Sequence, residues 1–155
     1  MHADELFIFK KSLHQHLTDL VKQDIVELQN LIGDLRSSAG SETKSSVGDK
    51  YETARAMAHL EIEKLGHQLA EKEKALAVIT SFGGNRRCFV GEPGALAESA
   101  FGLIYIAIHR GEIHFDNRRV FCVSGASPVA KSLIGKKAGD EFVVNSSAHS
   151  IHMIV

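Results

Sequence analysis

The sequence predicts an α+β fold in which an N-terminal antiparallel helical hairpin, a coiled coil, precedes a small antiparallel β-sheet domain with one short helix. Two long apolar stripes, separated by a polar segment rich in Ser and Gly, predict the hairpin. Short β-like runs separated by turn residues, which begin after Gly83 and Gly84, predict the sheet. We therefore expect two parts, residues 1–81 and residues 82–155.

The first predicted helix carries an apolar stripe from Leu6 to Leu35, and the second carries one from Ala58 to Ile79. The three-four spacing keeps each stripe on one face of its helix. A helix of about 30 residues is roughly 45 Å long, and an apolar stripe of that length needs a partner. One position of the second stripe is polar, Lys72, whose aliphatic stem can cover apolar surface. The two stripes are expected to pair with each other. The first stripe comprises Leu6, Leu13, Leu17, Val21, Ile25, Leu28, Ile32 and Leu35.

A tip loop is expected at about residues 37–48, where Ser and Gly favour turns over helix. Asp49 and Glu52 follow at the start of the second helix. Because residues three apart share a helix face, their carboxylates can converge on one cation. The same pattern is also a capping box, which stabilises the first turn of a helix and performs no chemistry. Both interpretations stay open from these residues alone, and capping is the commoner use of the pattern.

The charge distribution argues against bulk nucleic acid as the partner. The formal net charge is −1, which gives no long-range field to hold a polyanion. No apolar run approaches the ~20 residues of a membrane span, and no signal-peptide pattern is present, so we expect a cytoplasmic protein without a membrane partner. Cys88 and Cys122 lie in apolar, strand-like contexts that favour a reduced, buried pair. The nine histidines lack the spacing of a zinc site.

The second half predicts an antiparallel meander followed by one short helix and two strands. Strand-like runs at residues 102–108, 113–115 and 120–123 are separated by turns, the second of them at Asp116-Asn117. Ser127-Pro128 predicts a helix start, and Gly135 predicts its end. No nucleophile, base and orienting group occur together, so we expect no catalysis by the chain itself. Six aromatic residues are expected in the core: Phe89, Phe101, Tyr105, Phe115, Phe121 and Phe142.

Two stretches of the sequence resemble a known family. The stretch SPVAKSLIGKKAGDE, residues 127–141, closely resembles the signature near the C-terminus of Gre-type transcript cleavage factors, the GreA/GreB family. The stretch GDKYETA, residues 48–54, is similar to the tip of the coiled coil in that family. The order of the predicted elements agrees over nearly the whole chain, whereas similarity of residues is confined to these two stretches.

The resemblance implies a transcription elongation factor with an FKBP-like C-terminal domain that docks on bacterial RNA polymerase. Its coiled coil would enter the secondary channel, where Asp49 and Glu52 help to hold the second Mg²⁺ jointly with the polymerase. The polymerase then cleaves backtracked RNA, so the factor meets the nascent RNA 3′ end only indirectly. We expect a monomer that holds no cofactor in isolation. The resemblance assigns polymerase contacts to Lys131, Leu133, Ile134 and Gly135. The alternative is that Leu133 and Ile134 only anchor the short helix.

Two departures from the family pattern keep other functions open. Arg55 stands near a position where the family carries an acid, and the tip loop has Glu42 as its only acid. These features favour a regulator that occupies the secondary channel without stimulating cleavage. A third hypothesis is a coiled-coil adaptor protein in which the acid pair is only a helix cap.

Overall fold

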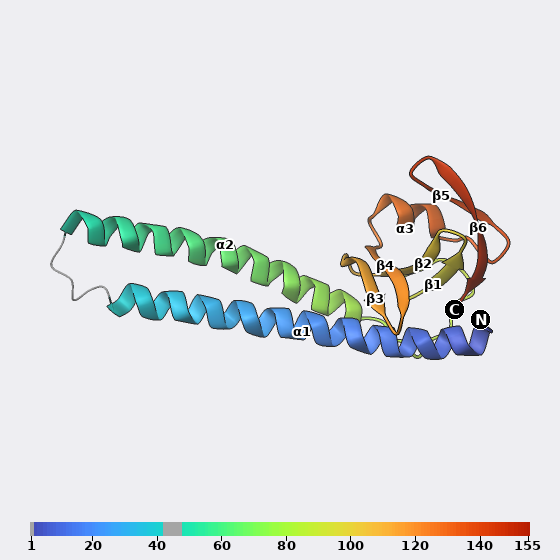
Figure 1. Ribbon diagram of the computed structural model, residues 1–155, viewed down its shortest axis with the longest axis horizontal. Helices are drawn as coiled ribbons and strands as arrows, with labels where there is room; N and C mark the ends of the chain where they lie inside the picture. Colours follow the sequence, from blue (N-terminus) through green and yellow to red (C-terminus); the bar gives the residue numbers. More distant parts are fainter. Residues whose placement is uncertain (1, 42–47) are drawn as a thin grey trace. The chain divides into compact units, whose positions relative to one another are not determined.

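The computed structural model describes residues 2–41 and 48–155, with the side chains of residues 39–41, 48 and 49 outside the described part. Two long helices, α1 (Ala3–Ser41) and α2 (Gly48–Thr80), precede a six-stranded sheet and a short helix, α3 (Pro128–Leu133) (Figure 1). The strands are β1 (Leu96–Ser99), β2 (Gly102–Ala107), β3 (Gly111–Phe115), β4 (Arg118–Ser124), β5 (Glu141–Val144) and β6 (Ser147–Ile154). The predicted α+β class, a helical hairpin followed by a small sheet with one helix, is confirmed.

The chain divides into two compact units. The hairpin unit is Asp19–Leu76, and the sheet unit combines Met1–Thr18 with Ala77–Val155. The start of α1 and the end of α2 therefore belong to the sheet unit, a division that differs from the one expected at residue 81.

The seam of the hairpin unit forms from the predicted stripes. Val21 and Ile32 of α1 and Leu65 of α2 are buried. Lys72 interrupts the second stripe and forms an ion pair with Asp24 of α1, with 3.1 Å between Nζ and Oδ2. The polar interruption therefore ties the two helices together at the edge of an otherwise apolar seam.

Two details of the hairpin prediction are wrong. Leu6, Leu13 and Leu17 belong to the first stripe, yet they are buried within the sheet unit. The periodicity of apolar residues predicts that one face of a helix is covered, but it does not identify the element that covers it. Helix α1 also continues to Ser41, so residues 37–41 are helical and not part of a loop. The intrinsic preferences of Ser and Gly, at most about 1 kcal/mol per residue, do not stop a helix that is already formed. Residues 42–47 of the expected tip loop, including Glu42, lie outside the described residues.

The strand order is β3-β4-β2-β1-β6-β5, and it corrects the predicted meander. Strand β4 pairs parallel with β2, and β3 pairs antiparallel with the other side of β4. Strand β2 lies in the middle of the sheet with five of its six residues buried, which is typical of a central strand covered on both faces. Alternation of apolar residues identifies such strands but does not specify their neighbours.

Two tight turns have positive φ angles, and the first of them confirms the turn predicted at Asp116-Asn117. Asp116 and Asn117 have φ values of 49° and 59°, and Asn145 and Ser146 have values of 50° and 66°. Consecutive positive φ values are typical of the type I′ turns that join antiparallel strands. The first pair of residues joins β3 to β4, and the second joins β5 to β6.

The core of the sheet unit contains Ile104, Ile106, Leu133, Phe142 and Ile151. The expected burial of Tyr105 and Phe142 is confirmed. Phe101, Phe115 and Phe121 are half-buried. Phe89 is 77% exposed, so its assignment to the core is wrong. Cys88 and Cys122 are both free and buried, as expected.

Candidate functional site

The first feature of interest is the start of α2, where the predicted acid pair lies. Helix α2 begins at Gly48, so Asp49 and Glu52 occupy its first turns. The Glu52 side chain is exposed, whereas the Asp49 side chain lies outside the described residues. The helical backbone brings side chains three residues apart onto one face, as a shared ligand position requires.

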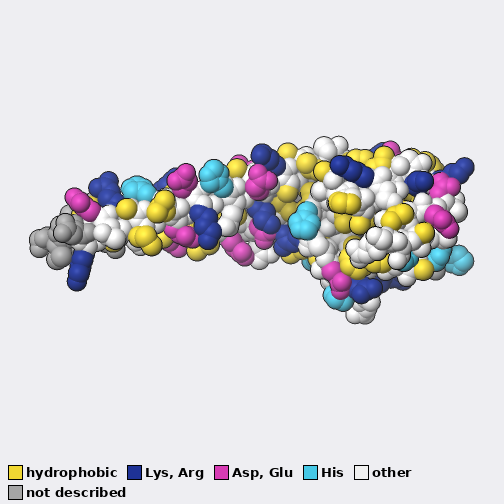
Figure 2. All heavy atoms as spheres, turned by 90° about the horizontal axis from the view of Figure 1, so that it is seen from above, with side chains coloured by type: hydrophobic (Ala, Val, Ile, Leu, Met, Phe, Trp, Pro, Cys, Tyr) yellow, Lys and Arg dark blue, Asp and Glu magenta, His cyan; other side chains and the backbone are white. Residues whose placement is uncertain are grey.

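Basic side chains accompany the two acids. The Arg55 guanidinium donates a hydrogen bond of 3.5 Å from Nη1 to the hydroxyl of Tyr51. Lys50 and Arg55 are both exposed. Figure 2 shows acidic and basic side chains mixed along the helices on the visible face. The start of α2 therefore carries one described exposed acid, Glu52, together with basic side chains that oppose the accumulation of a cation.

The second feature is the family-like segment around α3. The Ser127 side chain accepts a hydrogen bond of 3.1 Å from the Ala130 backbone N–H, and Pro128 takes the first helical position. Gly135 follows the helix with a φ of 76°, in the left-handed region that glycine adopts readily. The predicted start and end of this helix are both confirmed.

The residues assigned to polymerase contact differ in how far they are buried. Lys131 is exposed, and Ile134 is 45% exposed. Leu133 is fully buried, so its side chain packs in the core and is not available to a partner. Burial of Leu133 fits the anchoring alternative, whereas Ile134 is partly exposed and both alternatives stay open for it. Gly135 is exposed and offers only backbone to a partner.

Sequence reasoning missed a surface segment beside this helix. The Gly91 N–H donates to the Lys136 carbonyl at 2.7 Å, and the Gly135 N–H donates to the Gly91 carbonyl at 2.8 Å. These two bonds hold Gly91 alongside residues 134–136. Phe89, two positions before Gly91 in the sequence, is 77% exposed.

Strand β5, which is hydrogen-bonded to α3, carries a further exposed apolar side chain. The Val143 N–H donates to the Ser132 hydroxyl at 2.7 Å, which ties β5 to α3, and the Val143 side chain is exposed. We call the exposed apolar residues of these hydrogen-bonded segments, Phe89, Val90, Ile134 and Val143, the apolar patch. Exposed apolar groups that gather on a surface are typical of protein interaction sites. Their one sequence signal is the Phe89-Val90 pair directly before Gly91.

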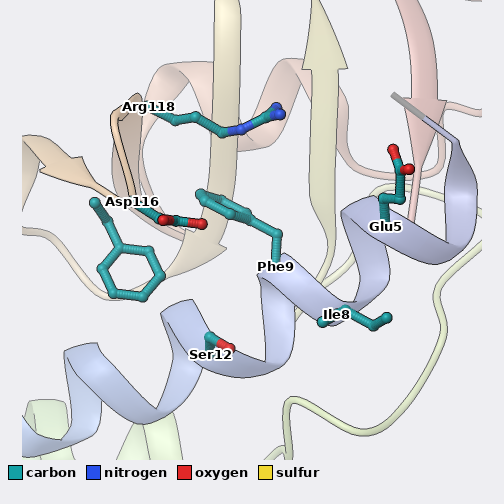
Figure 3. A pocket seen from close by; sticks show the side chains of 7 residues that line it. Glu5, Ile8, Phe9, Ser12, Asp116 and Arg118 are labelled. Atoms are coloured by element: carbon teal, nitrogen blue, oxygen red, sulfur yellow. The ribbon is translucent and has the colours of Figure 1, made fainter.

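A groove of about 580 Å³ lies between the start of α1 and the β3–β4 hairpin, all within the sheet unit. Figure 3 shows Phe9 with the Asp116 carboxylate and the Arg118 side chain around it. The Arg118 guanidinium lies 5.5 Å from the centre of the Phe9 ring. The groove contains none of the residues that the sequence nominates for function.

A buried polar cluster lies in the sheet unit. Lys10 is fully buried, and its Nζ donates to the Arg86 carbonyl at 2.7 Å and to the Cys88 sulfur at 3.8 Å. The His14 Nδ1 lies 2.7 Å from the Tyr105 hydroxyl. These contacts attach α1 to the segment before β1 and to the centre of the sheet.

Burial sets the protonation of this cluster. Desolvation lowers the pKa of Lys10, and desolvation together with the nearby Lys10 charge lowers the pKa of His14. Desolvation also raises the pKa of the Cys88 thiol and the Tyr105 hydroxyl, and raises the pKa of Cys122 to about 12. Each shift favours the uncharged form of its group.

Among the described residues, no three His, Cys, Asp or Glu side chains come together as a metal ligand set. Within the same residues, no helix combines the length and the apolar composition that a membrane crossing requires.

The fold thus defines a class of protein built from a helical hairpin and a small mixed sheet. No protein-family model matches the chain, and no curated protein matches it. Among solved structures, the chain is similar to the crystal structure of GreA factor homolog 1 (Gfh1) protein of Thermus thermophilus. The TM-score is 0.35 and the sequence identity is 15%, over 89% of this chain and 94% of that chain. A likeness of this degree assigns neither a family nor an activity to the chain.

Proposed function

We propose that the chain is a transcription elongation factor of Gre type. It binds bacterial RNA polymerase, inserts its hairpin into the secondary channel and stimulates cleavage of backtracked RNA by helping to hold the second Mg²⁺. The observation that carries the proposal is a pair of acids, Asp49 and Glu52, at the start of the second long helix of a hairpin. The resemblance of residues 48–54 and 127–141 to the GreA/GreB family supports the same function.

The chemistry of magnesium fits such an arrangement. Mg²⁺ usually takes one or two carboxylates and fills its remaining positions with water and phosphate oxygens. Two-metal sites hold their ions ~3.5–4 Å apart and stabilise both the attacking and the leaving oxygen. The exposed Glu52 carboxylate does not have to belong to a complete metal site in the isolated chain, because in this proposal the polymerase supplies the other ligands. The chain therefore acts as a cofactor of another enzyme.

The hairpin and the apolar patch have different roles in this proposal. Helix α2 has 33 residues and is roughly 50 Å long, which is a reach suited to a deep channel. The apolar patch supplies the docking surface, together with the exposed residues Lys131 and Lys136. Exposed apolar groups are typical of such surfaces. In this proposal the sheet unit binds the outside of the polymerase and the hairpin delivers the acids.

A second candidate is a secondary-channel regulator that binds without stimulating cleavage. Arg55 is the observation that favours it, because its positive charge lies one helical turn from Glu52 and opposes binding of a cation there. Such a protein inhibits the polymerase by occupancy, and its binding does not depend on Asp49 or Glu52.

A transcript-cleavage assay tests the first candidate. Backtracked elongation complexes are mixed with the wild-type chain, with Asp49→Ala, with Glu52→Ala and with Glu63→Ala. Glu63 is a matched control because it is an exposed acid on the same helix, outside the first turns. We expect the wild type and Glu63→Ala to shorten the RNA from its 3′ end. Loss of one metal ligand should slow shortening by about tenfold or more.

Binding to the polymerase separates the remaining outcomes. If the wild type binds and inhibits without shortening the RNA, and Asp49→Ala does the same, the second candidate replaces the first. If the chain recovers other proteins and no polymerase subunit, both candidates fail and the adaptor hypothesis is favoured.

A further inference from the structure

Lys10 and Cys88 form a buried pair that the proposed function does not use. Both side chains are almost completely inaccessible to solvent, and 3.8 Å separates Nζ from Sγ. The bond from Nζ to the Arg86 carbonyl, at 2.7 Å, holds the amine beside the sulfur. An amine and a thiol kept this close leave no room for a water molecule between them, and they bond once they approach each other further.

We propose that Lys10 and Cys88 are an oxidative modification site, at which hydrogen peroxide joins the Lys10 nitrogen to the Cys88 sulfur in a sulfenamide bond. The inference rests on this geometry and not on the function proposed above. Oxidised cysteine is known to condense with nitrogen nucleophiles as well as with thiols. Here the Lys10 amine lies 3.8 Å from the Cys88 sulfur.

The reaction has two balanced steps. First, the Cys88 sulfur attacks one oxygen of the peroxide, the O–O bond breaks, and the products are a sulfenic acid and one water. The sulfur is oxidised and the peroxide is reduced. Second, the unprotonated Lys10 amine attacks this sulfur, so that the N–S bond forms and the S–O bond breaks. The departing hydroxide takes a proton from the nitrogen and becomes a second water. One amine, one thiol and one peroxide thus give one sulfenamide and two waters.

The surroundings favour the second step more than the first. Burial lowers the pKa of Lys10, which increases the fraction of unprotonated amine. Burial raises the pKa of the Cys88 thiol, and because the thiolate is the reactive form, oxidation of this cysteine is slow. Cys88 is only 1% exposed, so its limited access to peroxide slows this step further. We therefore expect the link to form under oxidative stress and not in ordinary handling.

The link would fasten α1 to the segment that carries Phe89. It closes a long loop between residues 10 and 88, and such closure stabilises a fold mainly by restricting the unfolded chain. The midpoint temperature of the sheet unit should therefore rise after oxidation, and it should return to its starting value after treatment with dithiothreitol.

Peptide mass spectrometry tests the proposal directly. The folded chain is treated with hydrogen peroxide, alkylated, and digested with trypsin in the absence of thiols. The expected product joins residues 1–11 to residues 88–110, which are the tryptic peptides around the two side chains. Its mass is about 2 Da below the sum of the two peptides, because two hydrogens leave. The product should be absent before oxidation and lost after reduction.

Three variants and one condition make the result decisive. Cys122→Ser and Lys11→Arg should keep the linked product, because neither residue takes part, whereas Cys88→Ser should lose it. Oxidation in concentrated urea should give little product, because the link depends on the folded geometry. The proposal is overturned if the folded wild type yields only sulfinic acid at Cys88. It is also overturned if the link retains an oxygen atom, or if it forms equally well in urea.

Discussion

Replacing Gly91 by alanine tests the close approach that builds the apolar patch. A Cβ at this position would lie 1.9 Å from the Leu133 carbonyl oxygen, where ordinary contacts begin at 3.4 Å. The obstacle is backbone, so no side chain can rotate away to make room. The φ angle of Gly91 lies outside the left-handed region, and steric overlap is therefore the only penalty that the methyl group introduces.

The expected loss of stability can be worked out from the segments that the new methyl group displaces. The two segments have to separate, which breaks or lengthens the bonds from Gly91 N to Lys136 O, at 2.7 Å, and from Gly135 N to Gly91 O, at 2.8 Å. Each bond contributes about 0.5–1.5 kcal/mol, and forced overpacking costs about 1–3 kcal/mol. The free energy of unfolding should fall by roughly 2–6 kcal/mol, a large share of the ~5–15 kcal/mol of a typical domain.

Urea unfolding followed by near-ultraviolet circular dichroism is the assay, since Tyr105 is buried in the sheet unit and reports its packing. Gly83→Ala is the matched control, because its new Cβ would meet nothing closer than the Asn85 nitrogen at 3.8 Å. The control should change stability by no more than about 0.5 kcal/mol. Equal losses in the two variants, or a loss below about 1 kcal/mol in Gly91→Ala, would refute the reasoning.

Two further perturbations address the buried cluster and the hairpin seam. Because burial and Lys10 lower the pKa of His14, the unfolded chain binds more protons below about pH 6.5. The stabilisation that comes from uncharged His14 is therefore fully present above that pH and is lost as the pH falls. In urea unfolding, the free energy of unfolding should decrease less steeply with falling pH in His14→Gln than in the wild type. Leu65→Ala should cost about 2–4 kcal/mol, because Leu65 is buried in the seam. Leu60→Ala, at a position 63% exposed on the same helix, should stay within about 0.5 kcal/mol in the same assay.

The local features of the fold were accessible from the sequence. Helix periodicity, the Ser127-Pro128 start of α3 and the turn at Asp116-Asn117 all depend on residues within a few positions of one another. The sequence did not reveal which elements far apart along the chain pack or pair with each other. Leu13 has the spacing of a hairpin seam but is buried in the sheet unit, and the β-like runs did not reveal that β4 pairs parallel with β2.

The candidate site shows the same division. The Asp49 and Glu52 spacing correctly placed both residues at the start of α2, because helix starts are encoded locally. Phe89 was assigned to the core by its hydrophobicity alone. Phe89 is exposed in a segment that pairs, through Gly91, with residues 135 and 136, which lie more than forty positions away along the chain. Interaction surfaces often expose residues that the rules of folding would bury, so hydrophobicity misassigns them.

The central claim is that the start of α2 reaches the catalytic centre of RNA polymerase. A photo-crosslinking amino acid placed at position 52 tests it most directly, with position 63 of the same helix as the reference, in complexes of the chain with backtracked polymerase. We predict crosslinks from position 52 to the RNA 3′ end and to polymerase residues that surround the catalytic magnesium, and none to the RNA from position 63. Crosslinks from position 52 that reach only the outer surface of the polymerase, or no polymerase subunit, would contradict the claim.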